Sequence, residues 1–374
     1  MAEVEEGSPV PALRLTAQDE RFAHAFAIIR KAIEGRAFPG ASLAVTHRGA
    51  LVVRKAFGRL TYDAGAPAVA PITIFDLASV TKVVATTPMA MAVCARGGLE
   101  LDAPVVEFLP EFDNPHDQRR RQVTVRMLLA HSSGLPAYIK LHEQASNRAE
   151  LIALAMRTPL AAPPMAQTAY SDIGFILLGL ILEKLAGEPL DSFCRREIFE
   201  PFGMGSACFN PPEEERAQIP PTLDDREFRK RVVQGEVNDE NAFAMGGVAG
   251  HAGLFANAFD VAIFAHRLLS CPQPVFQPET VALFTERQKL PHGTTRALGW
   301  DTPLQLSQSG RYFSARSFGH LGYTGTSLWC DPERQLSVTF LTNRTWPDRG
   351  TQAIKQVRPQ VHDAIVEAIL GEKV

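Results

Sequence analysis

Apolar residues near the N-terminus follow two different periods. Between residues 18 and 35 they recur at three- and four-residue steps, which predicts a helix that Pro39-Gly40 ends. Two short apolar runs follow at 41–46 and 51–57, and both are typical of strands. The polar segment 47–50 lies between them and contains a glycine. It therefore predicts a β-hairpin.

The central part of the chain has the pattern of helices, and strands return near the C-terminus. A helical pattern runs from Ser79 to about Ala95. Residues 86–285 contain mostly helical segments joined by loops rich in proline and glycine. Two further strands are predicted at 326–330 and 336–342, and the last element of the chain, near residue 370, has a helical pattern.

This distribution of strands predicts how the chain is organised. Because strands occur at both ends and helices in the middle, we expect an α/β fold of the α+β type. One lobe would consist of residues 1–85 and 286–374, and a mostly helical lobe, 86–285, would be inserted into it. Residues 1–15 are expected to be a loose leader. The active site would lie in the cleft between the lobes, where pockets are common.

Composition and charge narrow the classes of partner. The chain has 374 residues and a formal net charge of −3, so nothing favours nucleic acid or an anionic membrane as a partner. The five cysteines are scattered, without a CxxC pair or a Cys/His cluster, so we expect reduced thiols and no metal site. The N-terminal segment lacks the basic and apolar regions of a secretory signal. We therefore expect a cytoplasmic protein.

The tetrad Ser79-Val80-Thr81-Lys82 is the first candidate for chemistry. On a helix, residues three apart share a face, so the two polar side chains can meet. Serine needs a neighbouring base to act as a nucleophile, and burial can lower the pKa of a lysine until it accepts a proton. A helix N-terminus also offers N–H groups to a developing anion. Alone, the S-x-x-K pattern is also compatible with an N-cap serine followed by a surface lysine.

Further motifs in a fixed order change that assessment. Tyr170-Ser171-Asp172 precedes a predicted helix, and the segment 319–325, Gly-His-Leu-Gly-Tyr-Thr-Gly, lies at the start of a late strand. With these motifs the chain resembles the serine β-lactamase and penicillin-binding protein superfamily, above all its class C β-lactamase-like and family VIII esterase branch. The resemblance covers about residues 18 to 370 and also includes Pro39-Gly40-Ala41-Ser42, the segment 128–135, the segment 247–254 and Leu298-Gly299-Trp300.

The resemblance implies a fold and a set of catalytic roles. It implies a β-lactamase-like fold, in which an antiparallel sheet is flanked by helices and a mostly helical lobe is inserted. Ser79 matches the nucleophile of the family, and Lys82 matches its lysine partner. Tyr170 matches the tyrosine of the Y-x-N motif. Lys82 and Tyr170 are then expected to move the protons, with Lys82 at least partly neutral or exchanging protons with Tyr170.

The late strand implies further roles. His320-Leu321-Gly322 matches the strand motif written K-T-G or H-x-G. Gly322 is expected where a larger side chain would crowd the substrate. The backbone N–H groups of Ser79 and Tyr323 are then expected to form an oxyanion hole.

Two residues depart from the family pattern. Asp172 replaces the usual asparagine, which removes an amide donor and adds a negative charge near Lys82. His320 replaces lysine, so a permanent cation is lost. Arg344 follows a strand that should flank the site, and it is either a ligand for a substrate carboxylate or part of a surface ion pair. Both departures favour esters and small amides over β-lactams.

The sequence therefore predicts a serine hydrolase that forms an acyl-enzyme on Ser79. Its expected substrate is a small ester, an amide or a short peptide, as for an esterase, an amidase or a D-amino-acid peptidase. No cofactor is expected, and no pattern in the chain predicts an oligomeric state. A β-lactamase is the alternative within the same chemistry. A non-catalytic penicillin-binding or scaffold protein is the alternative of a different class.

Overall fold

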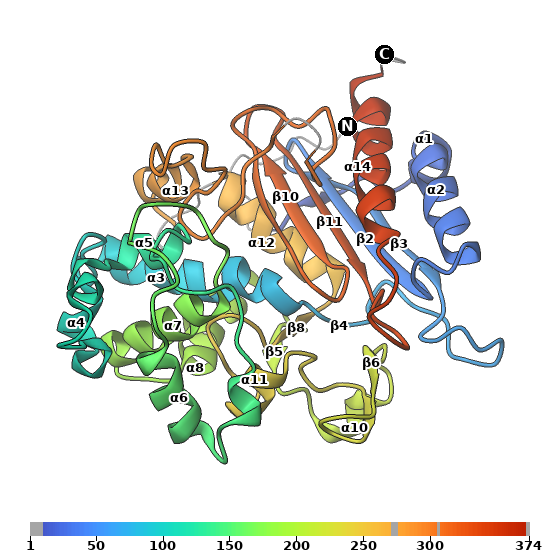
Figure 1. The fold of residues 1–374 in the computed structure, drawn as a ribbon. Helices are drawn as coiled ribbons and strands as arrows, with labels where there is room; N and C mark the ends of the chain where they lie inside the picture. Colours follow the sequence, from blue (N-terminus) through green and yellow to red (C-terminus); the bar gives the residue numbers. More distant parts are fainter. Residues whose placement is uncertain (1–9, 271–275, 305–306, 372–374) are drawn as a thin grey trace.

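A six-stranded sheet lies at the centre of the structure, with helices on both of its faces (Figure 1). The computed structural model describes residues 10–270, 276–304 and 307–371. Three strands come from the N-terminal segment and three from the C-terminal segment. They are β1 (Ala12–Leu13), β2 (Gly40–His47), β3 (Ala50–Gly58), β9 (Phe318–Leu321), β10 (Ser327–Asp331) and β11 (Leu336–Thr342).

Strand pairing joins the two ends of the chain into one sheet. The strand order is β1-β3-β2-β11-β10-β9, and neighbouring strands are antiparallel except for β1 beside β3. At the centre, Leu43 of β2 lies opposite Phe340 of β11. Both strands are buried along almost their whole length. This burial explains why their sequences are apolar runs rather than alternations of apolar and polar residues.

Helices cover the two faces of the sheet. On one face, α2 (Ala23–Glu34) packs against α14 (Ile354–Leu370), and the residues of α2 at helical spacing, such as Phe26 and Ile29, are buried there. On the other face, α12 (Ala258–Ser270) packs against β2 and β11. The sheet is therefore a middle layer that holds its edge strand β9 in a fixed position.

The rest of the chain forms a mostly helical region beside the sheet (Figure 1). Its centre is the apolar helix α7 (Asp172–Ala186), whose residues are mostly buried. Two turns, the 3-10 turn η1 (Ala78–Val80) and the π-helical turn η2 (Lys82–Thr86), lead into α3 (Thr87–Ala95). The remaining α-helices and strands of the whole structure are α1 (Gln18–Arg21), α4 (Val105–Phe108), α5 (Val125–Leu129), α6 (Arg148–Arg157), α8 (Leu190–Cys194), α9 (Glu200–Phe202), α10 (Glu213–Arg216), α11 (Glu240–Ala244), α13 (Pro278–Thr285), β4 (Phe75–Asp76), β5 (Cys208–Phe209), β6 (Leu223–Asp225), β7 (Arg231–Val233) and β8 (Leu254–Ala256).

The predicted α/β class and the antiparallel sheet are confirmed. The helix predicted over residues 18–35 is present as α1 and α2, and the predicted hairpin is β2 with β3. The leader prediction is wrong at one point, because Ala12–Leu13 pair with Ala50–Leu51 as β1. The lobe boundary near residue 285 stays a prediction. The helix α12 lies within the predicted insertion, yet it packs against the sheet.

The structure shows where the longest apolar helical run and the cysteines lie. The run Ala78–Ala95 is long and apolar enough to cross a membrane, but 83% of it is buried inside the fold, as in the core helix of a soluble protein. Four cysteines, Cys94, Cys194, Cys208 and Cys330, are free thiols. The fifth, Cys271, lies outside the described residues.

Candidate active site

The candidate nucleophile lies in a tight turn that follows a short strand. Ser79 belongs to η1, directly after β4, and is half-buried. The preceding Ala78 has a φ of 47°, an uncommon conformation for a residue with a Cβ. The Asp76 carboxylate holds this turn, because it accepts a hydrogen bond from the N–H of Ala78 at 2.8 Å. Backbone strain of this kind is often kept at functional sites.

The predicted meeting of Ser79 and Lys82 is present in the structure. Lys82 Nζ donates to Ser79 Oγ at 3.0 Å, to Asp172 Oδ1 at 2.7 Å and to the backbone carbonyl of His251 at 2.9 Å. The side chain is completely buried. An ammonium has three donors, and here each has an acceptor. Lys82 is therefore no surface residue, and its amine is held in one position against Ser79.

The charge state of Lys82 differs from one of the two alternatives that the sequence left open. Burial acts to lower its pKa, but the Asp172 carboxylate and Tyr170 together outweigh burial, so the pKa of Lys82 is raised above its ordinary value. The raised pKa keeps the amine charged near neutral pH, so the expectation of a partly neutral Lys82 does not hold for the free protein, while proton exchange with Tyr170 stays a prediction. Asp172, the residue that departs from the family pattern, is the larger of these two causes, and an asparagine in its place would carry no charge.

Tyr170 lines the same cavities as Ser79 and lies immediately before the N-cap of α7. Its ring centroid is 5.0 Å from Lys82 Nζ, and its buried hydroxyl makes no hydrogen bond of good geometry with the described residues. Burial raises the pKa of Tyr170, against the opposing effect of the Lys82 charge. His131 supports this segment, because its ring lies 4.6 Å from the Tyr170 ring and its Nδ1 accepts from the N–H of Ser171 at 3.0 Å. This contact gives His131 a structural role in holding the segment that carries Tyr170.

His320 lies on the edge strand β9 and is neutral. Its Nδ1 is 2.8 Å from the carbonyl of Leu321, so Nδ1 carries the proton and donates it. The other nitrogen, Nε2, is buried without a hydrogen-bond partner among the described residues. Burial, followed by the charges of Lys82 and Arg296, lowers the pKa of His320 well below its ordinary value. The structure thus agrees with the expected loss of a permanent cation.

The turn between β9 and β10 is fastened directly to the nucleophile turn. The hydroxyl of Thr324 donates to the Asp76 carbonyl, and that of Thr326 donates to the Leu77 carbonyl, both at 2.8 Å. The N–H of Tyr323, in this turn, makes no hydrogen bond to another described residue. A free backbone N–H beside the nucleophile has the chemistry of an oxyanion-hole donor.

The structure gives Gly322 a packing role, and the expected crowding of the substrate stays a prediction. A Cβ on Gly322 would overlap the Thr326 hydroxyl and the Leu77 carbonyl. The glycine therefore allows close approach between the strand end and the nucleophile turn, which is a packing requirement inside the protein.

Arg344 is buried, and it forms no ion pair with the described residues. Its side chain is 5% exposed, and it donates to the carbonyl of Tyr323 at 2.8 Å and to that of Thr351 at 3.0 Å. Burial lowers its pKa from the ordinary value. It thus braces the turn that carries Tyr323, and it lines a cavity beside Ser79.

Sequence reasoning missed two acidic residues that organise this site. Asp76 joins two walls of the site, because its second oxygen accepts from the N–H of Asn238 at 2.6 Å. Asp239 contacts His251 Nε2 at 2.7 Å, and the carbonyl of that histidine is an acceptor for Lys82. The position of Asp76, three residues before Ser79, was a usable signal. Nothing in the sequence connects Asp239 to the site.

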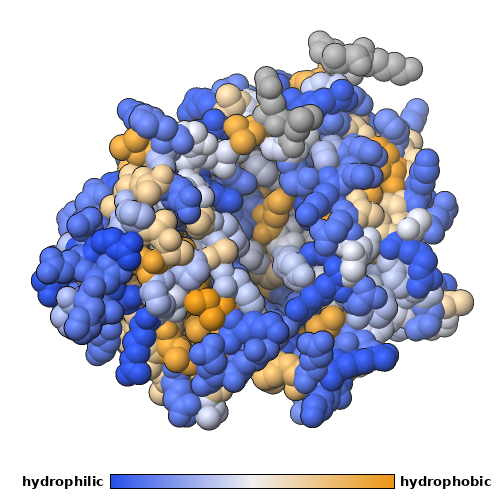
Figure 2. Space-filling model, viewed as in Figure 1, coloured by the Kyte–Doolittle hydropathy of each residue, from blue (hydrophilic) through white to orange (hydrophobic). Residues whose placement is uncertain are grey.

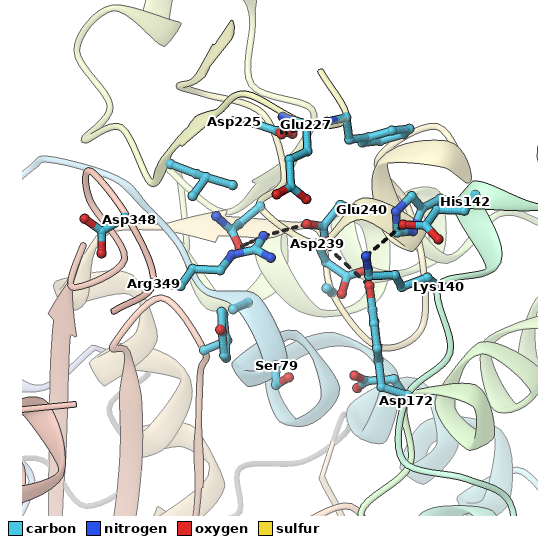
Figure 3. Close-up of a pocket in the computed structure, with 18 of the residues that line it drawn as sticks. Ser79, Lys140, His142, Asp172, Asp225, Glu227, Asp239, Glu240, Asp348 and Arg349 are labelled. Carbon is cyan, nitrogen blue, oxygen red and sulfur yellow. Dashed lines mark hydrogen bonds and ion pairs between the residues drawn. The ribbon is translucent and has the colours of Figure 1, made fainter. Parts of the chain in front are cut away.

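Two cavities meet at Ser79. The larger, about 870 Å³, lies between the loops around residues 138–143 and 223–228, and Figure 3 shows Asp225 and Glu227 at the end opposite Ser79. The smaller, about 340 Å³, runs along β9 toward the start of α14. Both are lined by Ser79, Tyr170 and Tyr323. The space-filling view shows the surface hollowed between the helical region and the sheet (Figure 2).

Comparison with known proteins gives a consistent result. A family model described as Beta-lactamase matches residues 25–361. A protein of Escherichia coli K12, provisionally named D-alanyl-D-alanine carboxypeptidase, is 32% identical over 82% of this chain and 79% of its own length. The N-acetylmuramyl-L-alanine amidase of Bacillus subtilis 168 is 35% identical over 82% of this chain and 77% of its own length.

Solved structures share the fold. EstCE1, described as a hydrolase with promiscuous acyltransferase activity, superposes with a TM-score of 0.76 at 22% identity, over 94% of this chain and all of its own. A penicillin-binding protein homologue from Caulobacter crescentus superposes with a TM-score of 0.75 at 19% identity, over 93% of this chain and 98% of its own. The fold is therefore the β-lactamase-like fold.

Proposed function

The chain belongs to the serine β-lactamase and penicillin-binding protein superfamily, and on that premise we propose that it is a hydrolase that acylates itself on Ser79. The observation that carries this proposal is the position of Lys82 Nζ, which is 3.0 Å from Ser79 Oγ and fully buried. A serine hydroxyl with a fixed amine at hydrogen-bond distance is the arrangement that nucleophilic catalysis needs.

The proposed reaction has two steps. Ser79 Oγ attacks the carbonyl carbon of the substrate, the bond from that carbon to the leaving nitrogen or oxygen breaks, and the serine proton reaches the leaving group through Lys82 and Tyr170. Water then attacks the acyl-serine ester, which releases the carboxylic acid and returns a proton to Ser79. The N–H groups of Ser79 and Tyr323 are the proposed donors to the oxyanion in both steps.

The base in this reaction has to be formed first. Lys82 and Tyr170 both have raised pKa values, so both hold their protons in the free protein. One of these two protons has to leave before either group can accept the proton of Ser79. We therefore propose that kcat/KM increases as the pH rises from neutral to alkaline.

Amide and ester bonds are the proposed targets. The two relatives described above are named for the cleavage of a peptide bond and of an amide bond, and the structural neighbour EstCE1 is named as a hydrolase. These names support a small amide, a short peptide or an ester as the substrate of this chain. A β-lactamase remains the alternative within the same chemistry.

Covalent labelling tests the proposal. Intact-mass spectrometry after treatment with a fluorophosphonate should show a single adduct that is absent from Ser79→Ala. Lys82→Ala and Tyr170→Phe should lower the turnover of an activated ester by about a hundred- to ten-thousandfold, the usual contribution of positioned acid–base groups. An adduct that persists in Ser79→Ala would reject the nucleophile. A stable adduct with a substrate ester that never hydrolyses would instead favour a non-catalytic penicillin-binding protein.

A further inference from the structure

The smaller cavity carries buried positive charge without matching negative charge. Arg344 and Arg358 are 5% and 3% exposed, and no carboxylate of the described residues lies within ion-pair distance of either. Arg358 donates to Gln308 Oε1 at 2.9 Å, and its Nε is buried without a hydrogen-bond partner. Burying a cation is costly unless it is paired. The arrangement is therefore that of a site prepared for an anion.

The other residues that line the smaller cavity also leave its net charge positive. Asp301 is the one carboxylate among the described residues that line this cavity, and it lies 3.9 Å from Arg296. The exposed Lys355 adds a further positive charge at the rim. Burial, and then the charge of Arg344, lower the pKa of Arg358 to about 9, as expected for two cations that share a site without an anion.

The residues that line the larger cavity carry a net negative charge. Within the described part of the chain, eight carboxylates line it, against three lysine or arginine side chains. The three cations form ion pairs with Glu143, Glu240 and Asp224 (Figure 3 draws several of these side chains). Glu227 and Asp348 are exposed and form no ion pair within the described residues, so negative charge is left over.

Aromatic rings around the larger cavity add to its preference for a cation. Tyr138, Phe228 and Tyr323 line it and are 40%, 38% and 49% exposed. Arg344 and Arg349 already lie over the Tyr323 ring and Arg229 over the Phe228 ring, so within the described residues Tyr138 is the ring without a cation over its face. The face of an aromatic ring attracts an ammonium or guanidinium group. Carboxylates and ring faces together favour a positively charged amine over a neutral apolar group.

From these two cavities we infer that the enzyme acts on zwitterionic substrates, with a charged amine in the acyl part and a carboxylate in the leaving part. This inference rests on the acyl transfer at Ser79 proposed above. In a short peptide the free ammonium lies on the acyl side of the scissile bond, and the free carboxylate lies on the amine side. The acidic cavity therefore holds the acyl part, and the basic cavity holds the amine that leaves when the C–N bond breaks.

Four matched dipeptides test this inference on the unchanged protein. Alanine dipeptides of the L- and D-series are prepared with both ends free, with the amine acetylated, with the carboxylate amidated, and with both ends capped. We expect the free dipeptide of the preferred series to have the highest kcat/KM, and each cap to lower it by about tenfold or more, since a charge-assisted hydrogen bond contributes about that much. Equal or faster cleavage of the capped peptides would overturn the inference, and so would the absence of cleavage of all four.

Variants assign each charge to its cavity. Arg358→Gln, or Arg344→Gln if the first variant does not fold, should reduce the preference for the free carboxylate only. Glu227→Gln combined with Asp348→Asn should reduce the preference for the free amine only. The exposed residues Arg157 and Glu107 lie outside both cavities, so Arg157→Gln and Glu107→Gln are matched controls that should leave both preferences unchanged. The assignment would be contradicted if the arginine variant lost the preference for the free amine, or if the double carboxylate variant lost the preference for the free carboxylate.

A neutral substrate separates this inference from the proposed function. Nitrophenyl acetate carries neither charge, so its hydrolysis reports only on the chemistry at Ser79. If the protein cleaves it through Ser79 but treats the four peptides alike, the charge assignment fails and the proposed function stands. If cleavage survives in Ser79→Ala, the proposed function itself fails.

Discussion

The Lys82 ammonium donates a hydrogen bond to the Asp172 carboxylate at 2.7 Å, and this contact sets the charge of the candidate active site. Asp172 is the first residue of α7, two positions after Tyr170. The same ammonium contacts Ser79 Oγ at 3.0 Å. The free protein therefore holds a charged lysine at its serine, and the base for catalysis appears only after a proton has left.

The first prediction follows from this pair. Because the Asp172 charge helps to raise the pKa of Lys82, Asp172→Asn should lower that pKa, and an opposite charge at this distance shifts a pKa by roughly one to three units. The rise of kcat/KM with pH on a neutral ester should then move to lower pH in the variant. Asp224→Asn is the control, because it removes a carboxylate of the same cavity that is paired with Arg226. An unchanged pH profile in Asp172→Asn would show that Lys82 is not the titrating base.

Sequence patterns predicted most of the fold because its sheet and helices are regular. The apolar periods of α2, α14, β2 and β11 reflect burial on defined faces, and such periods can be read without a structure. The short strand β1 was missed, since two residues carry no period and the pairing partner, Ala50–Leu51, is distant in sequence.

The sequence also predicted the catalytic motifs, but it did not predict the charge states and burial of the ionisable residues around them. Ser79, Lys82 and Tyr170 come together as their motifs predict. The pKa of Lys82 depends on the balance between its burial and its contact with Asp172, and a sequence gives no distances. Arg358 lies within α14 and looks like an ordinary surface residue in the sequence, whereas the fold buries it beside Arg344.

The second prediction concerns Gly322. A Cβ there would overlap the Thr326 hydroxyl and the Leu77 carbonyl, so Gly322→Ala should push β9 away from the nucleophile turn. We expect a loss of about 1–3 kcal/mol in the free energy of unfolding, the usual cost of overpacking, together with a lower kcat, since the Tyr323 N–H moves with the strand. Gly65→Ala is the control, because a Cβ on Gly65 meets no neighbouring atom. Urea unfolding and ester turnover measure both effects. Normal stability with lower activity would instead support crowding of the substrate.

The third prediction uses the buried carboxyl of Asp76. Burial raises its pKa to about 6 from 3.8, so its ionised form is disfavoured in the folded protein. The stability that the protonated group contributes is complete below pH 3.8 and is lost as the pH rises through about 6. Two pKa units correspond to about 3 kcal/mol. Asp76→Asn, which does not titrate, should therefore gain stability relative to the natural protein between pH 4.5 and pH 7.

Urea unfolding at the two pH values measures this change. The variant also loses one acceptor for a backbone N–H, but that cost is the same at both pH values and cancels in the comparison. Asp63→Asn, at an exposed carboxylate, controls for the removal of an acid from the chain. A difference between Asp76→Asn and the natural protein that does not vary with pH would contradict the raised pKa.

The last prediction concerns β-lactams. The sequence-based argument against them rested on two departures from the family pattern, Asp172 in place of asparagine and His320 in place of lysine. His320 is neutral, but Arg344 and Arg358 both line the cavity beside Ser79, so a carboxylate on the leaving part can still be held there. The stronger discrimination is expected on the acyl side, where the apolar side chains of common lactams would meet the carboxylates of the larger cavity.

We therefore expect a short-chain nitrophenyl ester to have a kcat/KM at least about tenfold above that of a chromogenic cephalosporin, since burying unpaired carboxylates against an apolar group costs more than 1.4 kcal/mol. Among penicillins, one with an amine in its acyl side chain should acylate Ser79 faster than the same penicillin without the amine, because only the amine can pair with Glu227 or Asp348. Acylation rates by mass spectrometry and hydrolysis rates by absorbance give both comparisons under one set of conditions. A clear preference for the cephalosporin would make β-lactam hydrolysis the better assignment for this chain, while equal acylation by the two penicillins would remove the role of the acidic cavity.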